Sequence, residues 1–519
     1  MTAKAMTVFS FFRSLEKRSL LKCFLALAAC EGHVMCVIDN TELETDEGLN
    51  MPSSLQENMF HEMKQKDIFR QAQKYAFDYA DSIKERHVYP TPDVIADLNN
   101  FCEEIPESWG NAVDVIERLN RYGTPASVAQ TGGRYFGFVN GGVLPVSLAA
   151  RWLSDFWDQN TALYVISPIA AKLEEVCESW LRKLFNLQEK VVAGFVSGSS
   201  LAIFCGLAAA RFRIFKNNGW DINKRGFYGA PKLRIVAGRQ AHGTIIKAIA
   251  LLGFGTDNIE WVETDAQGKI IPSEIPELDE TTILILQAGN VSSGAFDCFT
   301  EICEQASNKG AWVHIDGAFG LWAAASDRLN HLTRGMEKAD SFSVDGHKTL
   351  NTPYDSGIVL CNDKEALTYA LHASGSYIAY SENRDGMLYT PEMSRRARAV
   401  ELWAALKYLG KAGVDELVFG LHSRAVQIAR ELEAEKFQIL NDVVFNQVIV
   451  CCENDEITDQ TMRYIQDSGE CWVGGAVWDG KKIIRISICS WATTEQDISR
   501  SVRAFVTARK KAVKKFSGT

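Results

Sequence analysis

The feature that most constrains the fold of this 519-residue chain is a series of short apolar runs, separated by helical stretches, between about residues 130 and 362. Continuous apolar runs of four or five residues suit strands that are covered on both faces, and helical connections make such strands parallel. The sequence therefore predicts an α/β domain built on a mostly parallel sheet. The predicted strands are Leu233–Ala237, Thr282–Leu286, Trp312–Ile315, Ser341–Val344 and Gly357–Cys361.

Four segments follow from the pattern along the chain. Residues 1–55 are expected to form an extension, disordered or targeting, and residues 56–129 a helical segment that is interrupted at Tyr89-Pro-Thr-Pro92, where prolines remove amide donors. Residues 130–393 are the predicted large domain, and residues 394–519 a smaller α+β domain.

Two local signals support the small domain. The Asp479-Gly480 pair suits the positive φ angles of a tight hairpin turn, so the strands around it are predicted to be antiparallel. Thr493-Thr-Glu-Gln496 resembles a capping box that opens a final helix.

Composition excludes several classes of function. A net charge of -10 argues against a nucleic-acid partner, because phosphate binding needs concentrated Lys and Arg. The thirteen cysteines form no CxxC pair and are odd in number, which favours reduced thiols over a metal site or a complete disulfide framework. No apolar segment reaches the roughly 20 residues that span a bilayer.

The first thirty residues carry basic side chains ahead of Phe24–Cys30, which resembles a short signal-peptide core. Lys22 beside that run and Glu16 within the basic region argue against a signal peptide. We expect a cytoplasmic protein, with secretion or organelle targeting left open, as is an overextended gene model.

Polar residues appear where three of the predicted strands end. Asp316 ends one apolar run, Lys348 follows another beside His347, and His242 follows the strand at Leu233–Ala237. The carboxyl ends of parallel strands share one edge of the sheet, where ligands bind. A lysine there can form a Schiff base, and an imidazole can stack on a flat ring and exchange protons near neutral pH.

A phosphate site is predicted where Val191–Ser200 leads into a strongly helical run. Ser199 and Ser200 offer backbone amides and hydroxyls at the helix N-terminus, although a helix cap without a ligand remains the alternative. The segment is neither a Walker A motif nor a GxSxG motif.

These groups match the needs of pyridoxal 5'-phosphate (PLP). This cofactor requires a lysine for its aldehyde carbon and an acid that keeps its pyridine nitrogen protonated. Lys348 and Asp316 fit that pair, and Ser199 with Ser200 would anchor the phosphate.

In order and spacing, the motifs resemble the group II PLP-dependent amino-acid decarboxylases, the family of aromatic-amino-acid and glutamate decarboxylases, on the fold-type I scaffold. The resemblance spans about residues 130–500. The motifs that carry it are Arg134-Tyr-Phe-Gly137, Ser167–Glu174, Phe195–Ala202, Gln240-Ala-His242, Ala295-Phe-Asp297, His314–Ala318, Asp345-Gly-His-Lys348 and Ser394–Arg398.

The resemblance implies a role for each matched residue. Lys348 would hold the cofactor covalently, Asp316 would pair with the pyridine nitrogen, and His242 would stack on the ring. His347 would join the two serines around the phosphate. The resemblance further implies a homodimer with its active site at the interface, which converts a small amino-acid substrate to an amine and carbon dioxide.

The chain departs from the family pattern in two places. Val291 stands where many members have a threonine near the substrate carboxylate, and we count the adjacent Asn290 among the cofactor-binding residues. The loop between Tyr377 and Ser394 is shorter than in the aromatic-amino-acid enzymes, and its polar part, Ser381–Gly386, is predicted to be an exposed, flexible lid.

The proton-donating loop tyrosine is predicted to be Tyr389 rather than Tyr380, with a packing role as the alternative for Tyr389. For Arg395, Arg396 and Arg398, pairing with acids is the simpler interpretation, and support of the site is the other.

Other functions remain open at this stage. The same lysine-bound cofactor supports transamination, carbon-carbon lysis or oxidative formation of an aldehyde, because the surrounding protein selects which bond breaks. A catalytically silent protein that keeps the PLP fold for binding is the remaining alternative.

Overall fold

The computed structural model describes residues 54–372, 380 and 382–517. The predictions for the first thirty residues, and for part of the loop after residue 372, lie outside these ranges. The chain divides into two compact units at Gln65. The first unit contributes helix α2 (Leu55–Gln65), which buries none of its residues. All other elements belong to the second unit.

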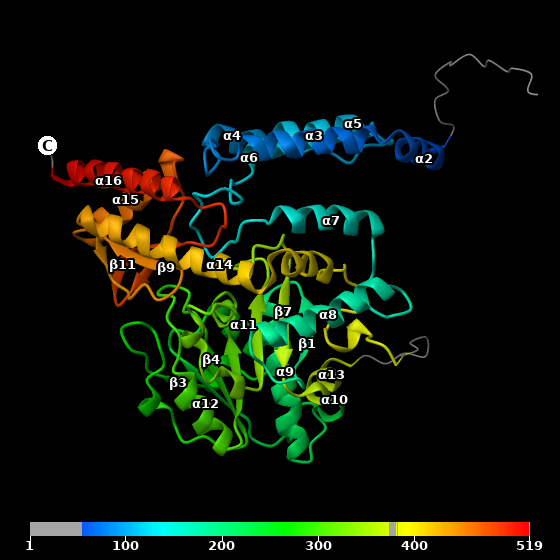
Figure 1. The fold of residues 1–519 in the computed structure, drawn as a ribbon, viewed down its shortest axis with the longest axis vertical. Coiled ribbons are helices and arrows are strands. Elements are labelled where there is room, and N and C mark those ends of the chain that lie inside the picture. The colour runs from blue at the N-terminus through cyan, green and yellow to red at the C-terminus, as the bar shows by residue number, and fades with distance from the viewer. Residues whose placement is uncertain (1–53, 373–379, 381, 518–519) are drawn as a thin grey trace, which may run out of the picture. The chain divides into compact units, whose positions relative to one another are not determined.

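The second unit contains a seven-stranded sheet of order β1-β7-β6-β5-β4-β2-β3 (Figure 1). Strands β2 to β6 run parallel, and all five predicted strands are present. The sheet consists of β1 (Val192–Val196), β2 (Arg234–Gly238), β3 (Ile259–Val262), β4 (Thr282–Gln287), β5 (Trp312–Asp316), β6 (Ser341–Asp345) and β7 (Gly357–Cys361).

Strand β7 differs from the expectation, because it runs antiparallel to both of its neighbours, β1 and β6. Residues 346–356 join β6 to β7 without a helix. A parallel return needs a crossover of a dozen or more residues, so this shorter connection reverses the chain direction.

Helices cover both faces of this sheet, which explains the continuous apolar strands. In β4, Ile283 and Ile285 pack on one face, whereas Leu284 and Leu286 pack on the other. The first face carries α9 (Ser199–Asn217), α11 (Gly243–Leu251) and α13 (Lys364–Leu371). The second face carries α8 (Pro168–Leu184), α12 (Phe299–Asn308) and part of α14 (Ala399–Ala434).

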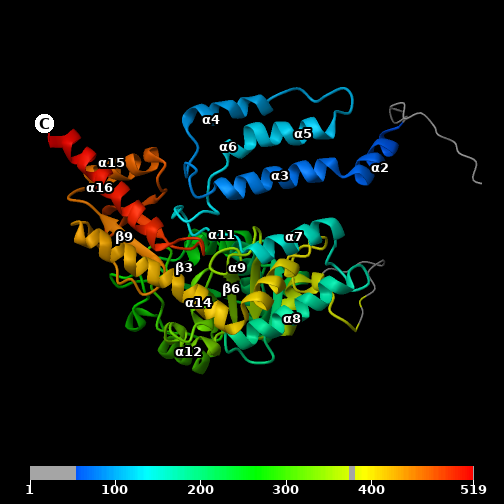
Figure 2. The ribbon, with the colours of Figure 1, turned by 45° about the horizontal axis from the view of Figure 1, so that its top comes forward.

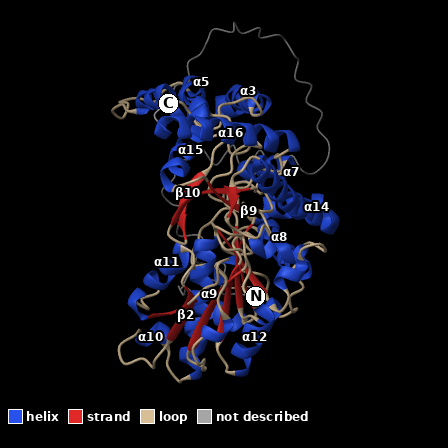
Figure 3. Cartoon of the chain, turned by 90° about the vertical axis from the view of Figure 1, so that its left-hand side faces the viewer, coloured by secondary structure: helices blue, strands red, loops and turns tan. Residues whose placement is uncertain are grey.

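The small domain is built on a separate antiparallel sheet of order β10-β11-β9-β8 (Figure 3). As predicted, Asp479 and Gly480 form the hairpin turn with φ angles of 47° and 74°. The elements are β8 (Gln438–Ile439), β9 (Gln447–Cys451), α15 (Asp455–Ser468), β10 (Gly474–Trp478), β11 (Lys481–Ser487) and α16 (Glu495–Ser517).

The cap of α16 lies one residue later than predicted. Thr494 accepts a hydrogen bond from the Asp497 amide, and Asp497 accepts one from the Thr494 amide. The reciprocal bonds therefore use the second threonine and an aspartate, rather than Thr493 and Gln496. An aspartate three residues after the cap reaches back in the same way as the glutamate of the common motif.

Helix α14 takes part in both hydrophobic cores. It bends at Gly410, whose φ is 59°. Val414 and Val418 pack in the core of the large sheet, whereas Leu421 and Ile428 pack in the core of the small domain. The two cores therefore meet within one helix.

The N-terminal helices of the second unit leave much apolar surface uncovered. Helix α3 (Asp67–Ser82) runs beside α5 (Ala112–Arg118), as Figure 2 shows, and neither helix contains a buried residue. On α7 (Pro145–Trp157), Leu153 and Phe156 are 56% and 64% exposed. The predicted break is confirmed, since α3 ends before the prolines and α4 (Pro92–Ala96) begins at the second of them.

Every cysteine among the residues that the structure describes is a free thiol, and all of these cysteines except Cys102 and Cys298 are buried. The described residues contain no group of three or more His, Cys, Asp or Glu side chains that could hold a metal ion. None of their helices is long and apolar enough to cross a bilayer.

Candidate active site

Lys348 lies three residues beyond the end of β6, and its side chain is 21% exposed. Its Nζ atom is 3.0 Å from Oδ2 of Asp345, the last residue of the strand. Burial works against the charged form, but Asp345 and then Asp316 outweigh it, so the pKa of Lys348 lies above its ordinary value. The lysine is therefore held as an ammonium ion.

Asp316 ends β5, the neighbouring strand, and its side chain is buried. It accepts hydrogen bonds from the Ser343 hydroxyl at 3.1 Å and from the Ala318 amide at 3.2 Å. Burial raises the pKa of Asp316, while electrostatic interactions with His242 and Lys348 oppose that rise. A carboxyl group in this setting gains from a cationic partner, which fits a protonated pyridine nitrogen.

His242 is the N-cap residue of α11, at the carboxyl end of β2. Its Nδ1 atom accepts from the Thr244 amide at 3.3 Å and lies 2.8 Å from the Thr244 hydroxyl, contacts that orient the ring. Desolvation lowers the pKa of His242, and the charges of Lys348 and Arg485 lower it further against the opposing Asp316. A neutral, flat imidazole is thus placed among the groups at this sheet edge.

The predicted phosphate site forms where β1 leads into α9. Ser199 is the first residue of the helix, and its amide donates to Asp345 Oδ1 at 2.6 Å. A Cβ atom at Gly198 would lie 3.4 Å from His347 Cε1. The ring of His347 accepts from the Ser356 amide through Nδ1 at 3.0 Å, which leaves Nε2 as the protonated nitrogen.

The donors around Gly198 suit a phosphate group. A glycine leaves room beside the helix N-terminus, where the exposed Ser200 adds a hydroxyl and an amide without an intrahelical acceptor. The Nε2 atom of His347 lies 3.7 Å from the Asp345 carboxylate, on the side of the helix terminus. The residues present therefore fit the phosphate of PLP, and Lys348, Asp316 and His242 fit its ring.

Sequence reasoning missed Arg485, which reaches the site from β11 in the small domain. Its guanidinium donates to the carbonyl oxygens of Val291 and Phe138, both at 3.2 Å. Among the described residues it has no carboxylate partner, and burial lowers its pKa. The sequence does contain a signal for it, because Arg485 is a lone arginine in the apolar run Ile483–Ile488. Successive side chains of a strand point to opposite faces, so Arg485 lies on the face opposite the buried Ile484.

Asn290 is placed differently from the cofactor-binding residues. Its Oδ1 accepts from the Ser292 and Ser293 amides at 2.9 and 3.2 Å, so it shapes the turn after β4. Its Nδ2 atom would lie 2.8 Å from a Cβ at Gly268. These contacts give Asn290 a structural role in the turn, and a contact with cofactor remains a prediction.

Tyr389 is packed in the interior, which is the alternative role that the sequence suggests for it. The residue is 6% exposed and belongs to the apolar cluster between the sheet and α9. The Arg384 guanidinium lies 4.2 Å from the centre of its ring, and its backbone oxygen lies against Gly194 in the middle of β1. Tyr380 is more accessible, at 38%.

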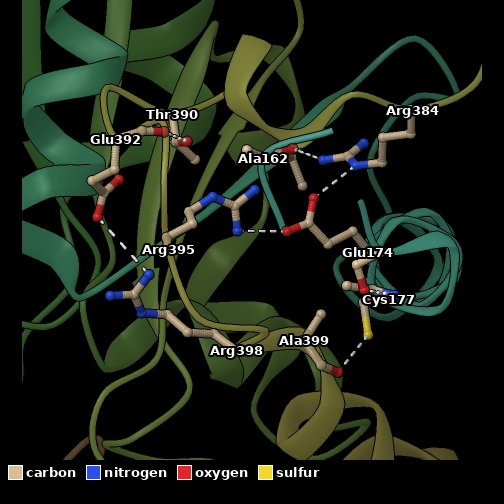
Figure 4. Close-up of polar contacts among 12 residues, drawn as sticks. Ala162, Glu174, Cys177, Arg384, Thr390, Glu392, Arg395, Arg398 and Ala399 are labelled. Carbon is tan, nitrogen blue, oxygen red and sulfur yellow. Dashed lines mark hydrogen bonds and ion pairs between the residues drawn. The ribbon is translucent and has the colours of Figure 1, made fainter. Parts of the chain in front are cut away.

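The expectation of an exposed lid is wrong for Arg384, Asp385 and Gly386. Arg384 donates to Glu174 at 3.0 Å (Figure 4). It also donates to Glu178, on the same helix α8, at 2.8 Å. Asp385 is 2% exposed and accepts from the Tyr164 amide at 2.8 Å. A charged segment suggests exposure to solvent, but two carboxylates of α8 pair with Arg384, and a backbone amide donates to Asp385.

The arginines that follow also pair with acids, as predicted. Arg395 meets Glu174 at 2.6 Å from the side opposite Arg384, and Figure 4 shows both guanidinium groups converging on this carboxylate. Burial opposes ionisation of Glu174, but the two arginines outweigh it and keep its pKa below the usual range. Arg396 and Arg398 contact Asp355 at 3.1 and 3.0 Å. These pairs fasten the segment before α14 to the large domain.

Comparisons with known proteins identify the family of the chain. Residues 96–452 match the family model described as the pyridoxal-dependent decarboxylase conserved domain. An aromatic-L-amino-acid decarboxylase of Bacillus atrophaeus is 27% identical over 377 residues, which cover 70% of this chain and 75% of that protein. The acidic amino acid decarboxylase GADL1 of Mus musculus is 28% identical over 358 residues, 65% of this chain and 64% of that protein.

Solved structures share the fold. Mouse CSAD in its apo form gives a TM-score of 0.78 at 21% identity, covering 86% of this chain and 99% of that one. Oryza sativa TDC with PLP and tryptamine gives 0.79 at 20% identity, covering 90% and 99%. With a family match over more than half of its length, the chain belongs to the pyridoxal-dependent decarboxylases and is a group II, PLP-dependent carboxy-lyase on the fold-type I scaffold.

Proposed function

We propose that this enzyme removes the α-carboxylate of an L-amino acid and releases the corresponding amine and carbon dioxide. The observation that carries the proposal is the convergence of Lys348, Asp316 and His242 at one sheet edge, faced by Arg485 from the small domain. Lys348, Asp316 and His242 suit the cofactor, and Arg485 is a cation that is available to bind the substrate.

Each of these side chains has a distinct task. Bound PLP supplies an electron sink for the bond that breaks. Lys348 would hold the cofactor covalently through Nζ. The Asp316 carboxylate would keep the proton on the ring nitrogen, and the neutral ring of His242 would cover one face of the cofactor.

Arg485 is proposed to bind the substrate carboxylate. Its guanidinium spends two hydrogen bonds on backbone carbonyls, and a guanidinium has five N–H donors in a fixed fork. Beside it, Phe138 is 61% exposed and lies 5.7 Å from Trp472, ring centre to ring centre. This aromatic pair would form a wall for the substrate side chain.

Replacing Arg485 with glutamine is expected to raise KM about 10- to 100-fold, because a charge-assisted bidentate contact is lost. Steady-state kinetics on the identified substrate measure it, and R485K should recover part of the loss. Lys482→Gln is the matched control, since Lys482 is an exposed cation on the same strand. An unchanged KM in R485Q would exclude Arg485 from carboxylate binding.

A homodimer is part of this proposal. The exposed apolar side chains on α7 and α3 support it, since contiguous apolar surface of this kind marks an interface. We also infer a cytoplasmic location, which the free thiols of the described residues support.

The test of the function is a screen of the purified, PLP-loaded protein against the twenty standard amino acids and common nonstandard ones. Carbon dioxide, amine and aldehyde are all measured. Equal amounts of carbon dioxide and amine from one or a few amino acids would support the proposal. Keto acid without carbon dioxide would identify a transaminase, and no turnover with bound cofactor would favour the silent binding protein.

The loop tyrosines can be separated by product analysis. Because Tyr389 is packed under Arg384, we now propose Tyr380 as the proton donor to the α-carbon. Tyr380→Phe should lower amine yield about tenfold or more and shift product toward aldehyde in the presence of dioxygen. Tyr389→Phe, the matched control, should keep the wild-type ratio. The reverse result would restore Tyr389 to that role.

A further inference from the structure

Asp345 places a carboxylate where the cofactor phosphate is expected. The side chain is 1% exposed, and its Oδ1 atom accepts from the Ser199 amide at 2.6 Å. Its Oδ2 atom is 3.0 Å from Lys348 Nζ. One buried anion thus contacts both the first amide of α9 and the lysine that would hold the cofactor.

The hydrogen bonds of the other amides in the first turn of α9 show which N–H donors remain available to a ligand. The Leu201 and Ala202 amides both donate to the Gly198 carbonyl at 3.0 Å. With Ser199 donating to Asp345, the Ser200 amide is the one in this turn that remains for a phosphate. A helix N-terminus attracts anions through such amides and its dipole, so the aspartate and a phosphate compete for one positive region.

We propose that Asp345 is a positioning residue that sets the charge of the cofactor site: it occupies the Ser199 amide as an internal anion and holds Lys348 as an ammonium ion until cofactor binds. This inference rests on the proposed function, because it assumes that the phosphate binds at α9 and the aldehyde reacts at Lys348. Asp345 is therefore expected to weaken the binding of the phosphate and to slow the reaction of Lys348 with the aldehyde.

The slower reaction of Lys348 with the aldehyde follows from the protonation of its amine. A lysine attacks an aldehyde only as the neutral amine, since the ammonium ion has no lone pair. The carboxylate at 3.0 Å favours the ammonium form. An asparagine of the same shape would keep an acceptor for the Ser199 amide but remove the negative charge from both neighbours.

Two ligands separate the two effects in the purified apoprotein. The first is 4'-deoxypyridoxine 5'-phosphate, which carries the phosphate but no aldehyde. Its Kd, measured by calorimetry, should fall about tenfold or more in D345N, because repulsion between two anions at the helix terminus is removed. The second is pyridoxal, which carries the aldehyde but no phosphate. Its rate of covalent attachment to Lys348 should rise about tenfold in D345N, with K348A as the background.

Asp340→Asn is the matched control, because Asp340 is a partly buried aspartate immediately before the other end of β6. Its Oδ2 atom accepts from the Val313 amide at 2.8 Å and its Oδ1 atom from Asn362 Nδ2 at 3.2 Å, and an asparagine keeps one of these two contacts through its single oxygen. D340N should behave as wild type with both ligands. D345S provides a second variant in case D345N does not fold, with the same direction expected for both readouts.

Unchanged or weaker analogue binding in D345N, or failure of wild type and D345N alike to bind it, would overturn the inference. So would an unchanged rate of attachment of pyridoxal. Failure of the proposed function is recognised separately, because it shows as an absence of amine and carbon dioxide from the PLP-loaded wild type. The binding measurements on Asp345 do not depend on turnover.

Discussion

Replacing Lys348 with alanine is expected to remove the visible absorbance of lysine-bound cofactor and to lower carbon dioxide release at least about a thousandfold. The reason is covalent: we propose Nζ of Lys348 as the nucleophile at the sheet edge where Asp316 and His242 also lie, and alanine has none. Absorbance spectra of the PLP-reconstituted protein and single-turnover assays measure the two effects.

Lys348→Arg is the control that separates charge from covalency. Arginine retains a cation for Asp345, which pairs with Lys348 at 3.0 Å, but it cannot form the bond to the aldehyde carbon. K348R should therefore lose absorbance and activity while its thermal unfolding stays closer to that of the wild type than K348A does. Retained absorbance in either variant would show that another group holds the cofactor.

Replacing Asp316 with asparagine is expected to lower kcat about a hundredfold or more, equivalent to about 2.7 kcal/mol in the barrier. The neutral amide cannot hold the ring nitrogen in its protonated form, so the cofactor loses most of its capacity to accept electrons. Lys348 is untouched, and the lysine-bound absorbance should persist. Stopped assays of carbon dioxide and spectra of the same samples test both statements.

Two observations make the Asp316 result specific. The amide oxygen introduced by Asp316→Asn can still accept from the Ser343 hydroxyl, so the local hydrogen bonding at the ends of β5 and β6 should survive. Asp340→Asn, at the far end of β6, should leave kcat near the wild-type value. If D316N retained most of its turnover, the ring nitrogen would not need a charged partner in this enzyme.

Much of the large domain could be predicted from the sequence, because a strand buried on both faces has an unbroken apolar composition. Thr282–Leu286 illustrates this, since successive residues of β4 pack in two different cores. The composition of Gly357–Cys361 does not show its direction, but the length of the connection before it does, because a parallel return needs a crossover of a dozen or more residues. Its antiparallel pairing follows from the length of residues 346–356.

The charged loop shows the main limit of reading sequence alone. Arg384 is separated from Glu174 by more than two hundred positions, and nothing local indicates that the two side chains meet at 3.0 Å. Solvent was therefore the expected partner. The packing of Tyr389 could not be predicted for the same reason, because its burial depends on β1 and on the arginine over its ring.

The sequence by itself determined which groups exist and at which strand ends they appear: Lys348, Asp316, His242 and the turn at Ser199. Chain order suffices for these residues, since the carboxyl ends of parallel strands share one edge. Tertiary structure alone decided the arrival of Arg485 from the small domain and the contact of Asp345 with the helix terminus at Ser199. Those contacts join segments distant in sequence, and only packing in three dimensions brings these groups within a few ångströms.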